Sequence, residues 1–299
     1  MTPQTRSLIR HAHAMARELG ARVIFLYADV VEADEVLADM IRDVAFRLIL
    51  VSRRSGFRPP AGWEDLCTVL HVPDVRMTRA GQVKVAMLVA TVEGLIEPGE
   101  KVVWLTGIQG SNTLDTVLVL DLNSEKEMFS MGSLGPLPVD VRPAVFERLL
   151  DLATELGSEG REGHRVGAIF VVGDTARVME ESRQLVINPF HGYPESERNI
   201  LDPLLEETVK EFSAIDGAYI IRGDGVIVSA ARYLVPLEKP IDPLPAGLGT
   251  RHEAAAWITN STSAVAVCVS QSTGAVTVFR SGKIVTDLQR PRSRMHDDF

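Results

Sequence analysis

Short apolar runs of strand length alternate with segments of helical periodicity along the first part of this 299-residue chain. The runs are wholly or almost wholly apolar and too short for helices, and they cover 23–27, 46–51, 70–72, 102–105 and 117–120. Apolar residues at helical spacing occupy the segments between them, at about 5–19, 33–42 and 79–93. Helix and strand in alternation are typical of an α/β domain with a largely parallel sheet and helices on its faces. We therefore predict a three-layer α/β domain.

A second α/β domain is expected beyond a polar segment that contains several prolines. The polar run 121–126 is followed by Pro136, Pro138 and Pro143, and it predicts an interdomain join near residue 125, to within about ten residues. The predicted domains are thus residues 1–125 and 126–299. In the second, strands are expected at 166–172, 219–221, 226–228, 264–269 and 275–279, and helices at 145–156, 175–183 and 204–212.

The composition argues against several classes of protein. A net charge of −9 disfavours a nucleic-acid-binding surface, which needs a dense basic patch. No apolar run approaches the roughly 20 residues of a membrane-spanning helix, and the N-terminus has no apolar signal core. Two cysteines, Cys67 and Cys268, support neither a disulfide framework nor a zinc site. We predict a cytoplasmic protein that binds neither nucleic acid nor membrane.

The stretch Asp216-Gly217-Ala218 lies at a predicted helix-to-strand junction. At such a junction the Asp216 carboxylate can face a cleft, and Gly217 lets a flat ligand approach the backbone closely.

A second stretch, Gly249-Thr250-Arg251-His252, precedes the strong helix-forming sequence Ala254 to Ala256. We expect Thr250 to be the N-cap, with Arg251 and His252 in the first turn. A helix N-terminus presents free N–H groups and a partial positive charge, and with an Arg added it predicts a phosphate site. A carboxylate beside a phosphate site suggests metal-assisted nucleotide chemistry.

The loop 107–113 in the first domain is a further ligand candidate. Its amides, with the hydroxyls of Ser111 and Thr113, can surround an anion. It lacks the Lys of a P-loop, and the alternative is a strand-to-turn loop whose glycines only permit a sharp bend.

The two motifs and the turn from Ser270 to Gly274 together resemble the diadenylate cyclase domain of DisA-type proteins, which condenses two ATP molecules into cyclic di-AMP. The segments 167–174, 188–190 and 199–203 resemble the subgroup typical of archaea and some bacteria. In that subgroup a domain similar to the C-terminal domain of pyruvate kinase, which carries an effector site in some kinases, precedes the cyclase domain. The resemblance covers nearly the whole chain.

The resemblance implies a central mixed sheet flanked by helices in the cyclase domain, and it implies roles for named residues. Asp216 would be the catalytic carboxylate that holds Mn²⁺ or Mg²⁺, and Arg251 and His252 would be catalytic residues that receive the phosphates of ATP. The implied nucleotide-binding residues are Gly217, Ala218, Gly249, Thr250, Arg251, His252, Ser270 and Thr273. Because each domain binds one ATP, the enzyme would be a homo-oligomer, at least a dimer of cyclase domains.

Other roles remain open for several of these residues. Asp216 can cap a turn, Arg251 can pair with a surface acid, and His252 can be a buried histidine bonded to a carbonyl. Ser270 and Thr273 can be turn hydroxyls rather than nucleotide contacts.

Two positions depart from the family pattern. The family usually reads Arg-His-Arg where this chain has Glu253 as the third residue. A carboxylate facing the triphosphate would repel it, and the alternative is that Glu253, one residue further into the helix, points to solvent. Acidic residues often follow the serine equivalent to Ser270, where this chain has Gln271 and Ser272. Both departures are expected to lower activity if those positions serve catalysis. One alternative is therefore a weakly catalytic sensor of ATP or cyclic di-AMP. Another alternative, independent of these departures, places the function in the first domain, as an effector-binding module with the cyclase as its output.

Overall fold

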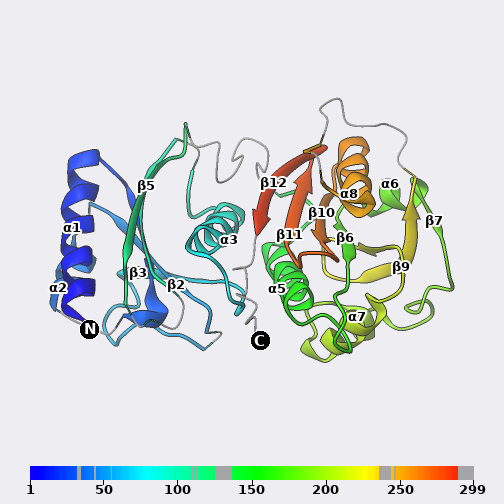
Figure 1. Cartoon of the computed structure of the whole chain (residues 1–299), viewed down its shortest axis with the longest axis horizontal. Coiled ribbons are helices and arrows are strands. Elements are labelled where there is room, and N and C mark those ends of the chain that lie inside the picture. Colours follow the sequence, from blue (N-terminus) through cyan, green and yellow to red (C-terminus); the bar gives the residue numbers. More distant parts are fainter. Residues whose placement is uncertain are drawn as a thin grey trace, which may run out of the picture.

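The computed structural model of the chain describes residues 1–31, 35–43, 45–54, 56–97, 99–108, 111, 113–124, 137–235, 244–245 and 247–288. Figure 1 shows two α/β domains, each built on its own mixed sheet. The predicted α/β class of both halves is confirmed, whereas the predicted join near residue 125 lies outside the described residues. Among the described helices, none combines the length and the apolar character needed to cross a bilayer.

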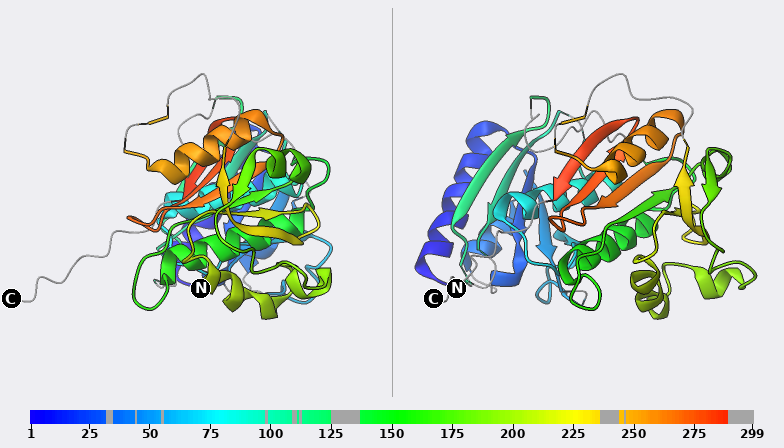
Figure 2. Two further views of the ribbon diagram at one scale, coloured as in Figure 1. Left: turned by 90° about the vertical axis from the view of Figure 1, so that its right-hand side faces the viewer. Right: turned by 45° about the vertical axis from the view of Figure 1, so that its right-hand side comes forward.

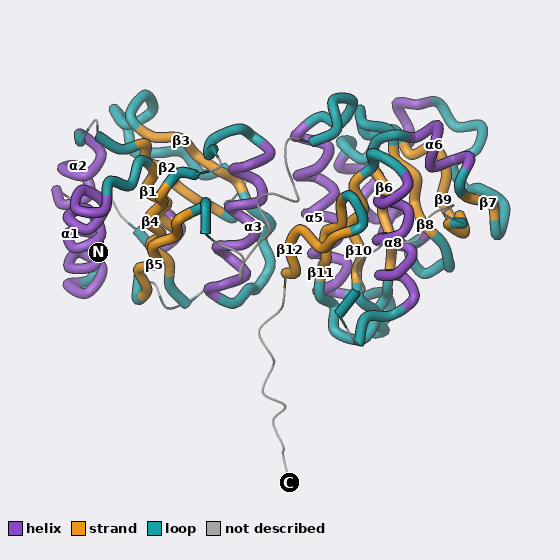
Figure 3. The backbone as a smooth tube through the Cα atoms, turned by 90° about the horizontal axis from the view of Figure 1, so that it is seen from above, coloured by secondary structure: helices purple, strands orange, loops and turns teal. Residues whose placement is uncertain are grey.

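The first domain is a five-stranded sheet between two layers of helices, with strand order β3-β2-β1-β4-β5. Strands β1 to β4 run parallel and β5 is antiparallel to β4. Helices α1 and α2 cover one face and α3 covers the other (Figures 1 and 3). The elements are α1 Pro3–Leu19, β1 Val23–Tyr27, a 3-10 turn Ala28–Val30, α2 Glu35–Arg42, β2 Arg47–Ser52, β3 Cys67–His71, α3 Arg79–Val92, β4 Lys101–Thr106 and β5 Thr116–Asp121.

Local sequence explains where these elements form. Thr2 caps α1, because its side chain accepts a hydrogen bond from the Thr5 amide. Ile9, Ala12 and Ala16 recur at helical spacing and are fully buried. Every residue of β1 is buried, as expected for a central parallel strand covered on both faces.

The second domain is a seven-stranded mixed sheet with strand order β12-β11-β10-β6-β8-β9-β7. Strands β6 and β8 are parallel, and the other neighbours are antiparallel. The elements are α5 Pro143–Glu159, β6 Ala168–Val172, α6 Thr175–Glu180, β7 Ser182–Gln184, two 3-10 turns Glu195–Arg198 and Pro203–Leu205, α7 Glu206–Phe212, β8 Ala218–Ile221, β9 Ile227–Leu234, α8 Thr250–Ser261, β10 Val265–Val269, β11 Val276–Arg280 and β12 Lys283–Leu288.

Helices cover both faces of this second sheet. Figure 2 shows α8 and α5 on opposite sides of it. Strand β10 explains the arrangement, because Val265 and Val267 pack in the hydrophobic cluster that includes α5, whereas Ala266 and Cys268 pack in the cluster that includes α8. Alternate residues of a strand point to opposite faces, so β10 forms part of both cores.

The predicted helix at 175–183 is wrong at its C-terminal end. Helix α6 stops at Glu180, and residues Ser182–Gln184 form the edge strand β7 instead. The residues pair with β9, where Arg183 is opposite Tyr233 and its guanidinium lies over the Tyr233 ring. The tertiary pairing overrides the local helical pattern.

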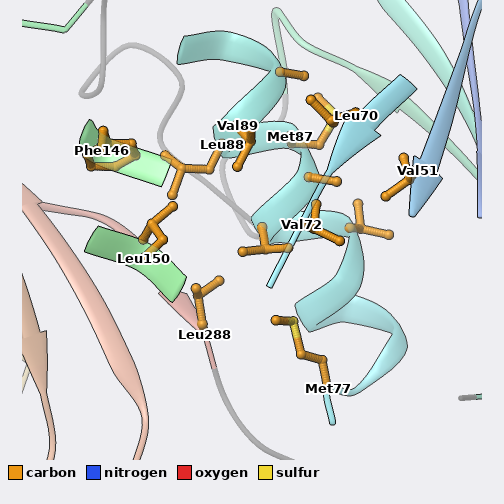
Figure 4. Close-up of a cluster of buried hydrophobic side chains, with 14 of the residues drawn as sticks. Val51, Leu70, Val72, Met77, Met87, Leu88, Val89, Phe146, Leu150 and Leu288 are labelled. Atoms are coloured by element: carbon orange, nitrogen blue, oxygen red, sulfur yellow. The ribbon is translucent and has the colours of Figure 1, made fainter. Parts of the chain in front are cut away.

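An apolar contact joins the two domains. Leu88 and Val89 of α3 lie in one continuous hydrophobic cluster with Phe146 and Leu150 of α5 and Leu288 of β12 (Figure 4). In addition, the Lys84 ammonium group donates to the Asp287 carbonyl oxygen at 3.3 Å. Helix α3 therefore packs on its own sheet and on the second domain.

Within the second domain, ion pairs between charged side chains connect α5 to α7. The Lys210 ammonium is only 4% exposed and lies 2.8 Å from Glu155 and 2.7 Å from Glu206. Hydrogen bonds and charge from these carboxylates raise the pKa of Lys210 against the opposing effect of burial. The ion pairs fix α7, the helix that leads to Asp216.

Asp151, which lies on α5, makes the free energy of unfolding depend on pH. Burial raises its pKa from 3.8 to about 7, and Glu155, Glu147 and Glu206 add to the rise while Arg148 opposes it. The folded chain thus holds a proton that the unfolded chain loses above pH 4, so the free energy of unfolding decreases between about pH 4 and pH 7. We expect Asp151→Asn, which cannot ionise, to be more stable than the wild type near pH 7.5 by up to about 4 kcal/mol, the equivalent of about three pKa units, with little difference near pH 4.

Denaturant unfolding of the full chain over that pH range measures the difference. Asp39→Asn makes the same exchange on α2 at a side chain that is 77% exposed, and it is the control for the substitution itself. A pH-independent difference for Asp151→Asn would contradict the assignment.

Candidate functional site

The loops that carry the predicted motifs meet at one edge of the second sheet. Ala168 at the start of β6 is in register with Val269 at the end of β10, and Ala218 at the start of β8 is opposite Ile169. The residues just before β6, just before β8 and just after β10 are therefore neighbours. Asp216 comes from the second of these connections and Gln271 from the third.

Asp216 and Arg251 form an ion pair at this edge. An Arg251 nitrogen, Nη2, donates to Asp216 Oδ1 at 2.8 Å. The Asp216 side chain is 86% exposed and that of Arg251 is 31% exposed, so both remain accessible to a ligand. The predicted association of a carboxylate with the α8 start is thus present in the structure, although the two residues are far apart in sequence.

Gln271 and Gly167 complete the surroundings of Arg251. Its second terminal nitrogen, Nη1, donates to Gln271 Oε1 at 3.0 Å. Gly167 lies beneath them, because a Cβ there would stand 3.0 Å from Arg251 Nη1 and 2.9 Å from Gln271 Cβ. Sequence reasoning treated Gln271 only as a departure from the family and gave Gly167 no role. A buried glycine directly before a central strand is the signal that could have indicated the close approach.

Gly217 allows an unusually close backbone contact beside Asp216. Its φ is +116°, and a Cβ there would stand 2.6 Å from the Ala231 carbonyl carbon and 2.7 Å from the Arg232 nitrogen. Ala231 has a positive φ of 56° at an irregularity in the β8–β9 pairing. Glycine is therefore needed at 217 for a steric reason inside the protein, whereas the close approach of a flat ligand to Gly217 stays a prediction. Ala218 follows as the first residue of β8 and is buried.

The N-terminus of α8 lies beside the ion pair. The N-cap is Gly249, with φ −85° and ψ 175°, and Thr250 is the first helical residue. The prediction that Thr250 is the N-cap is thus wrong by one residue. Thr250 is exposed, and the positive end of the 12-residue helix with Arg251 in its first turn forms an arrangement suited to phosphate.

His252 points into the core rather than toward Asp216. It is 6% exposed, and its ring meets the Phe279 ring edge-on at a centroid distance of 6.0 Å. Burial lowers the pKa of its imidazole, although the charge of Asp287 opposes this, so the ring is neutral near pH 7. Contact between the His252 ring and phosphate stays a prediction.

Ser270 and Thr273 belong to a tight turn between β10 and β11. The Ser270 amide donates to the Ala275 carbonyl at 2.9 Å, and the Gly274 amide donates to the Ser270 carbonyl at 2.8 Å. The hydroxyl of Thr273 accepts from the Ala275 amide at 3.2 Å. These bonds fix the turn that carries Gln271, and nucleotide contacts by Ser270 and Thr273 stay predictions.

Glu253, the other departure from the family, has an exposed side chain in the first turn of α8. The guanidinium that forms the ion pair with Asp216 belongs to Arg251, two residues before Glu253.

The loop in the first domain is partly outside the described residues, which omit 109, 110 and 112. In the described part, the Ser111 hydroxyl donates to the Ile108 carbonyl at 2.7 Å, and Thr113 Oγ1 donates to the Ser111 carbonyl at 3.3 Å. The two hydroxyls are used within the loop, which favours the turn interpretation.

A complete protein-made metal site is absent from the described residues, in which no group of three or more His, Cys, Asp or Glu side chains converges. Magnesium in nucleotide-dependent enzymes usually has one or two carboxylate ligands, and substrate phosphates and waters supply the rest. One exposed carboxylate beside a phosphate-type site fits this mode of binding. Asp216 is the residue that fits it here.

The fold and this edge together define a class of protein, namely a two-domain α/β protein with a phosphate-type site at one edge of its second sheet. Residues 155–284 match the family model described as DisA bacterial checkpoint controller nucleotide-binding, and residues 4–129 match the model described as probable sensor domain DacZ_P.

A diadenylate cyclase of Haloferax volcanii is 31% identical over 268 residues, which cover 85% of this chain and 96% of that protein. The chain therefore belongs to the diadenylate cyclases, the family that makes cyclic di-AMP from ATP, and its N-terminal part matches the probable sensor domain DacZ_P.

Two further comparisons cover less. A diadenylate cyclase of Methanocaldococcus jannaschii is 42% identical over 182 residues, which are 61% of this chain and 57% of that protein. A solved structure of DacA from Staphylococcus aureus is 26% identical and covers 47% of this chain and 83% of that chain, with a TM-score of 0.34.

Proposed function

We propose that this chain condenses two ATP molecules into cyclic di-AMP with release of two pyrophosphates. In each of two steps the 3′-oxygen of one ATP bonds to the α-phosphorus of the other. The bond from that phosphorus to the pyrophosphate oxygen breaks, and the hydroxyl proton is lost. The observation that best supports this is the Asp216–Arg251 pair at the start of α8, 2.8 Å apart. It combines a carboxylate, a guanidinium and a helix N-terminus at one accessible edge.

The protein's own groups would bind and orient the triphosphate. Arg251 and the free amides of the first turn of α8 attract the phosphates, together with the exposed Thr250. Gly217 and Ala218 would border the nucleotide, and Ser270 and Thr273 would contact it from the neighbouring turn. His252 would support the first turn by packing on Phe279, and its ring would receive phosphate only if it rotated outward.

Asp216 would hold Mn²⁺ or Mg²⁺ through its exposed carboxylate. When bound, such an ion neutralises phosphate charge and promotes ionisation of the attacking hydroxyl.

The reaction also requires two cyclase domains. Each domain would bind one ATP, and the product has two equivalent phosphodiester links, so a two-fold symmetric, face-to-face dimer places both reacting pairs alike. We propose a homo-oligomer built from at least this dimer.

The first domain, residues 1–125, would be the regulatory part, and residues 126–299 the cyclase. Four parallel strands between helical layers are compatible with a domain like the C-terminal domain of pyruvate kinase, and an effector bound there would act through the contact between α3 and the cyclase domain.

Incubation of the full chain with ATP and Mn²⁺ or Mg²⁺ tests the proposal. Mass spectrometry should show cyclic di-AMP, with two pyrophosphates per product. The rate per chain should increase with protein concentration until dimers are complete, and EDTA should lower it by about 100-fold or more. ATP that lacks the 3′-hydroxyl should bind without forming cyclic product. ATP binding without any product would instead support the weakly catalytic sensor.

A further inference from the structure

Arg251 is held between two oxygen atoms that differ in charge. Asp216 Oδ1 accepts from Nη2 at 2.8 Å, and Gln271 Oε1 accepts from Nη1 at 3.0 Å. The two acceptors come from different connections, one before β8 and one after β10. Together they fix the plane of the guanidinium, which a single partner would leave free to rotate.

The backbone at Gly167 forms the third side of this arrangement. A Cβ there would come within 3.0 Å of Arg251 Nη1, 2.9 Å of Gln271 Cβ and 3.1 Å of the Gln271 nitrogen. The Arg251 and Gln271 side chains are therefore packed on bare backbone. Such close packing indicates that the position of Gln271 relative to Arg251 is defined by the fold.

The charges of the three side chains sum to zero. Arg251 contributes +1, Asp216 contributes −1, and the amide of Gln271 contributes none. A glutamate at 271 would keep the shape of the side chain and bring the sum to −1, beside the place where a triphosphate has to bind. A unit charge within several ångströms of a phosphate, near the protein surface, changes affinity by about 10-fold.

We infer that Gln271 is a positioning residue whose neutral amide orients Arg251 without adding a second negative charge beside the phosphates of ATP. The inference rests on the proposed function, because it assumes that Arg251 receives the phosphates of ATP. It also reverses the expectation from sequence that Gln271 weakens the site. With an amide at 271, Asp216 is the single carboxylate that accepts a hydrogen bond from Arg251 among the described contacts.

A double-mutant cycle on the full chain tests the inference. The four proteins are the wild type, Asp216→Asn, Gln271→Glu and the double variant Asp216→Asn/Gln271→Glu, which exchanges the positions of the acid and the amide. Binding is measured by calorimetry in EDTA with the α,β-methylene analogue of ATP, which cannot release pyrophosphate. Turnover is measured separately with ATP and Mn²⁺.

Affinity for the analogue should decrease as the number of carboxylates in contact with Arg251 increases. Gln271→Glu should bind the analogue about 10-fold more weakly than the wild type, whereas the double variant should bind within about 3-fold of it. Asp216→Asn, which leaves no carboxylate on Arg251, should bind the analogue more tightly than the wild type. Turnover should instead require a carboxylate at position 216. The double variant should therefore make no cyclic di-AMP, although it binds the analogue.

Several outcomes would overturn the inference. Wild-type affinity in Gln271→Glu would show that the charge at 271 is immaterial, and weak binding by the double variant would show that the amide acts by shape rather than by charge. Gln4→Glu makes the same exchange on an exposed side chain of α1 and should leave binding and turnover unchanged. If the wild type makes no cyclic di-AMP from ATP with Mn²⁺, the proposed function itself fails, whereas normal wild-type binding and turnover with no effect of Gln271→Glu defeats only the inference.

Discussion

Replacing Asp216 with asparagine is expected to lower formation of cyclic di-AMP by about 10³-fold or more. The amide has the shape of the carboxylate and can still accept the hydrogen bond from Arg251 that now measures 2.8 Å. What it loses is the negative charge that would hold Mn²⁺ or Mg²⁺ at the reacting phosphate, and such electrostatic effects are among the largest in catalysis. Product is measured by mass spectrometry at saturating ATP.

A control for the loss of an Arg–Asp pair exists in the first domain. Asp74 is 69% exposed and lies 2.8 Å from Arg53, so Asp74→Asn removes a carboxylate in a similar setting. It should retain wild-type activity, and both variants should unfold within about 0.5 kcal/mol of the wild type. If Asp216→Asn kept more than a tenth of the activity, Asp216 would not be the catalytic carboxylate.

The exchange Gly217→Ala is expected to damage both stability and activity. The added methyl group would meet the Ala231 backbone at 2.6–2.8 Å, and the residue would have to keep a φ of +116°. The strain and the forced backbone shift should together cost about 3 kcal/mol. Because Asp216 is the preceding residue, a displacement of about 1 Å would also move the carboxylate, and activity should decrease about 100-fold.

Gly192 offers a matched control for the backbone conformation alone. Its φ is +87°, and nothing lies within 4 Å of the position of its Cβ. Gly192→Ala should cost only about 1 kcal/mol and leave turnover unchanged. Thermal unfolding and product formation give the two measurements, and equal effects of the two alanines on both would show that the close contact with Ala231 is unimportant.

The sequence predicts the parts of the site that are local in the chain. The position of Asp216 between a helix and a strand follows from periodicity, and the phosphate-type start of α8 follows from Gly249 and Arg251. The contacts of Arg251 with Asp216 and Gln271 could not be predicted, because they depend on which strands are neighbours in the sheet. The buried orientation of His252 also depends on tertiary packing, here on Phe279.

The fold shows the same division between local and distant information. The strands of the first domain follow from their apolar runs, whereas β7 forms only because β9 supplies its partner. The contact between the domains does have a local signal in the sequence of α3. Val83, Val85, Met87, Leu88 and Val89 of α3 are all buried, and a helix apolar on every side is expected to be covered on every side.

Because α3 packs against the second domain, separating the two domains would uncover an apolar surface. A cyclase fragment freed of the first domain would expose to water the surface around Leu288 that now packs near Leu88 and Val89 (Figure 4). Such an exposed apolar surface promotes association of copies in arbitrary orientations. These non-productive complexes would compete with the reactive dimer. If the fragment were inactive, the cause would then be non-productive association rather than the loss of a regulatory signal from the first domain. Substitutions on α3 in the intact chain separate these two effects, because the surface stays covered.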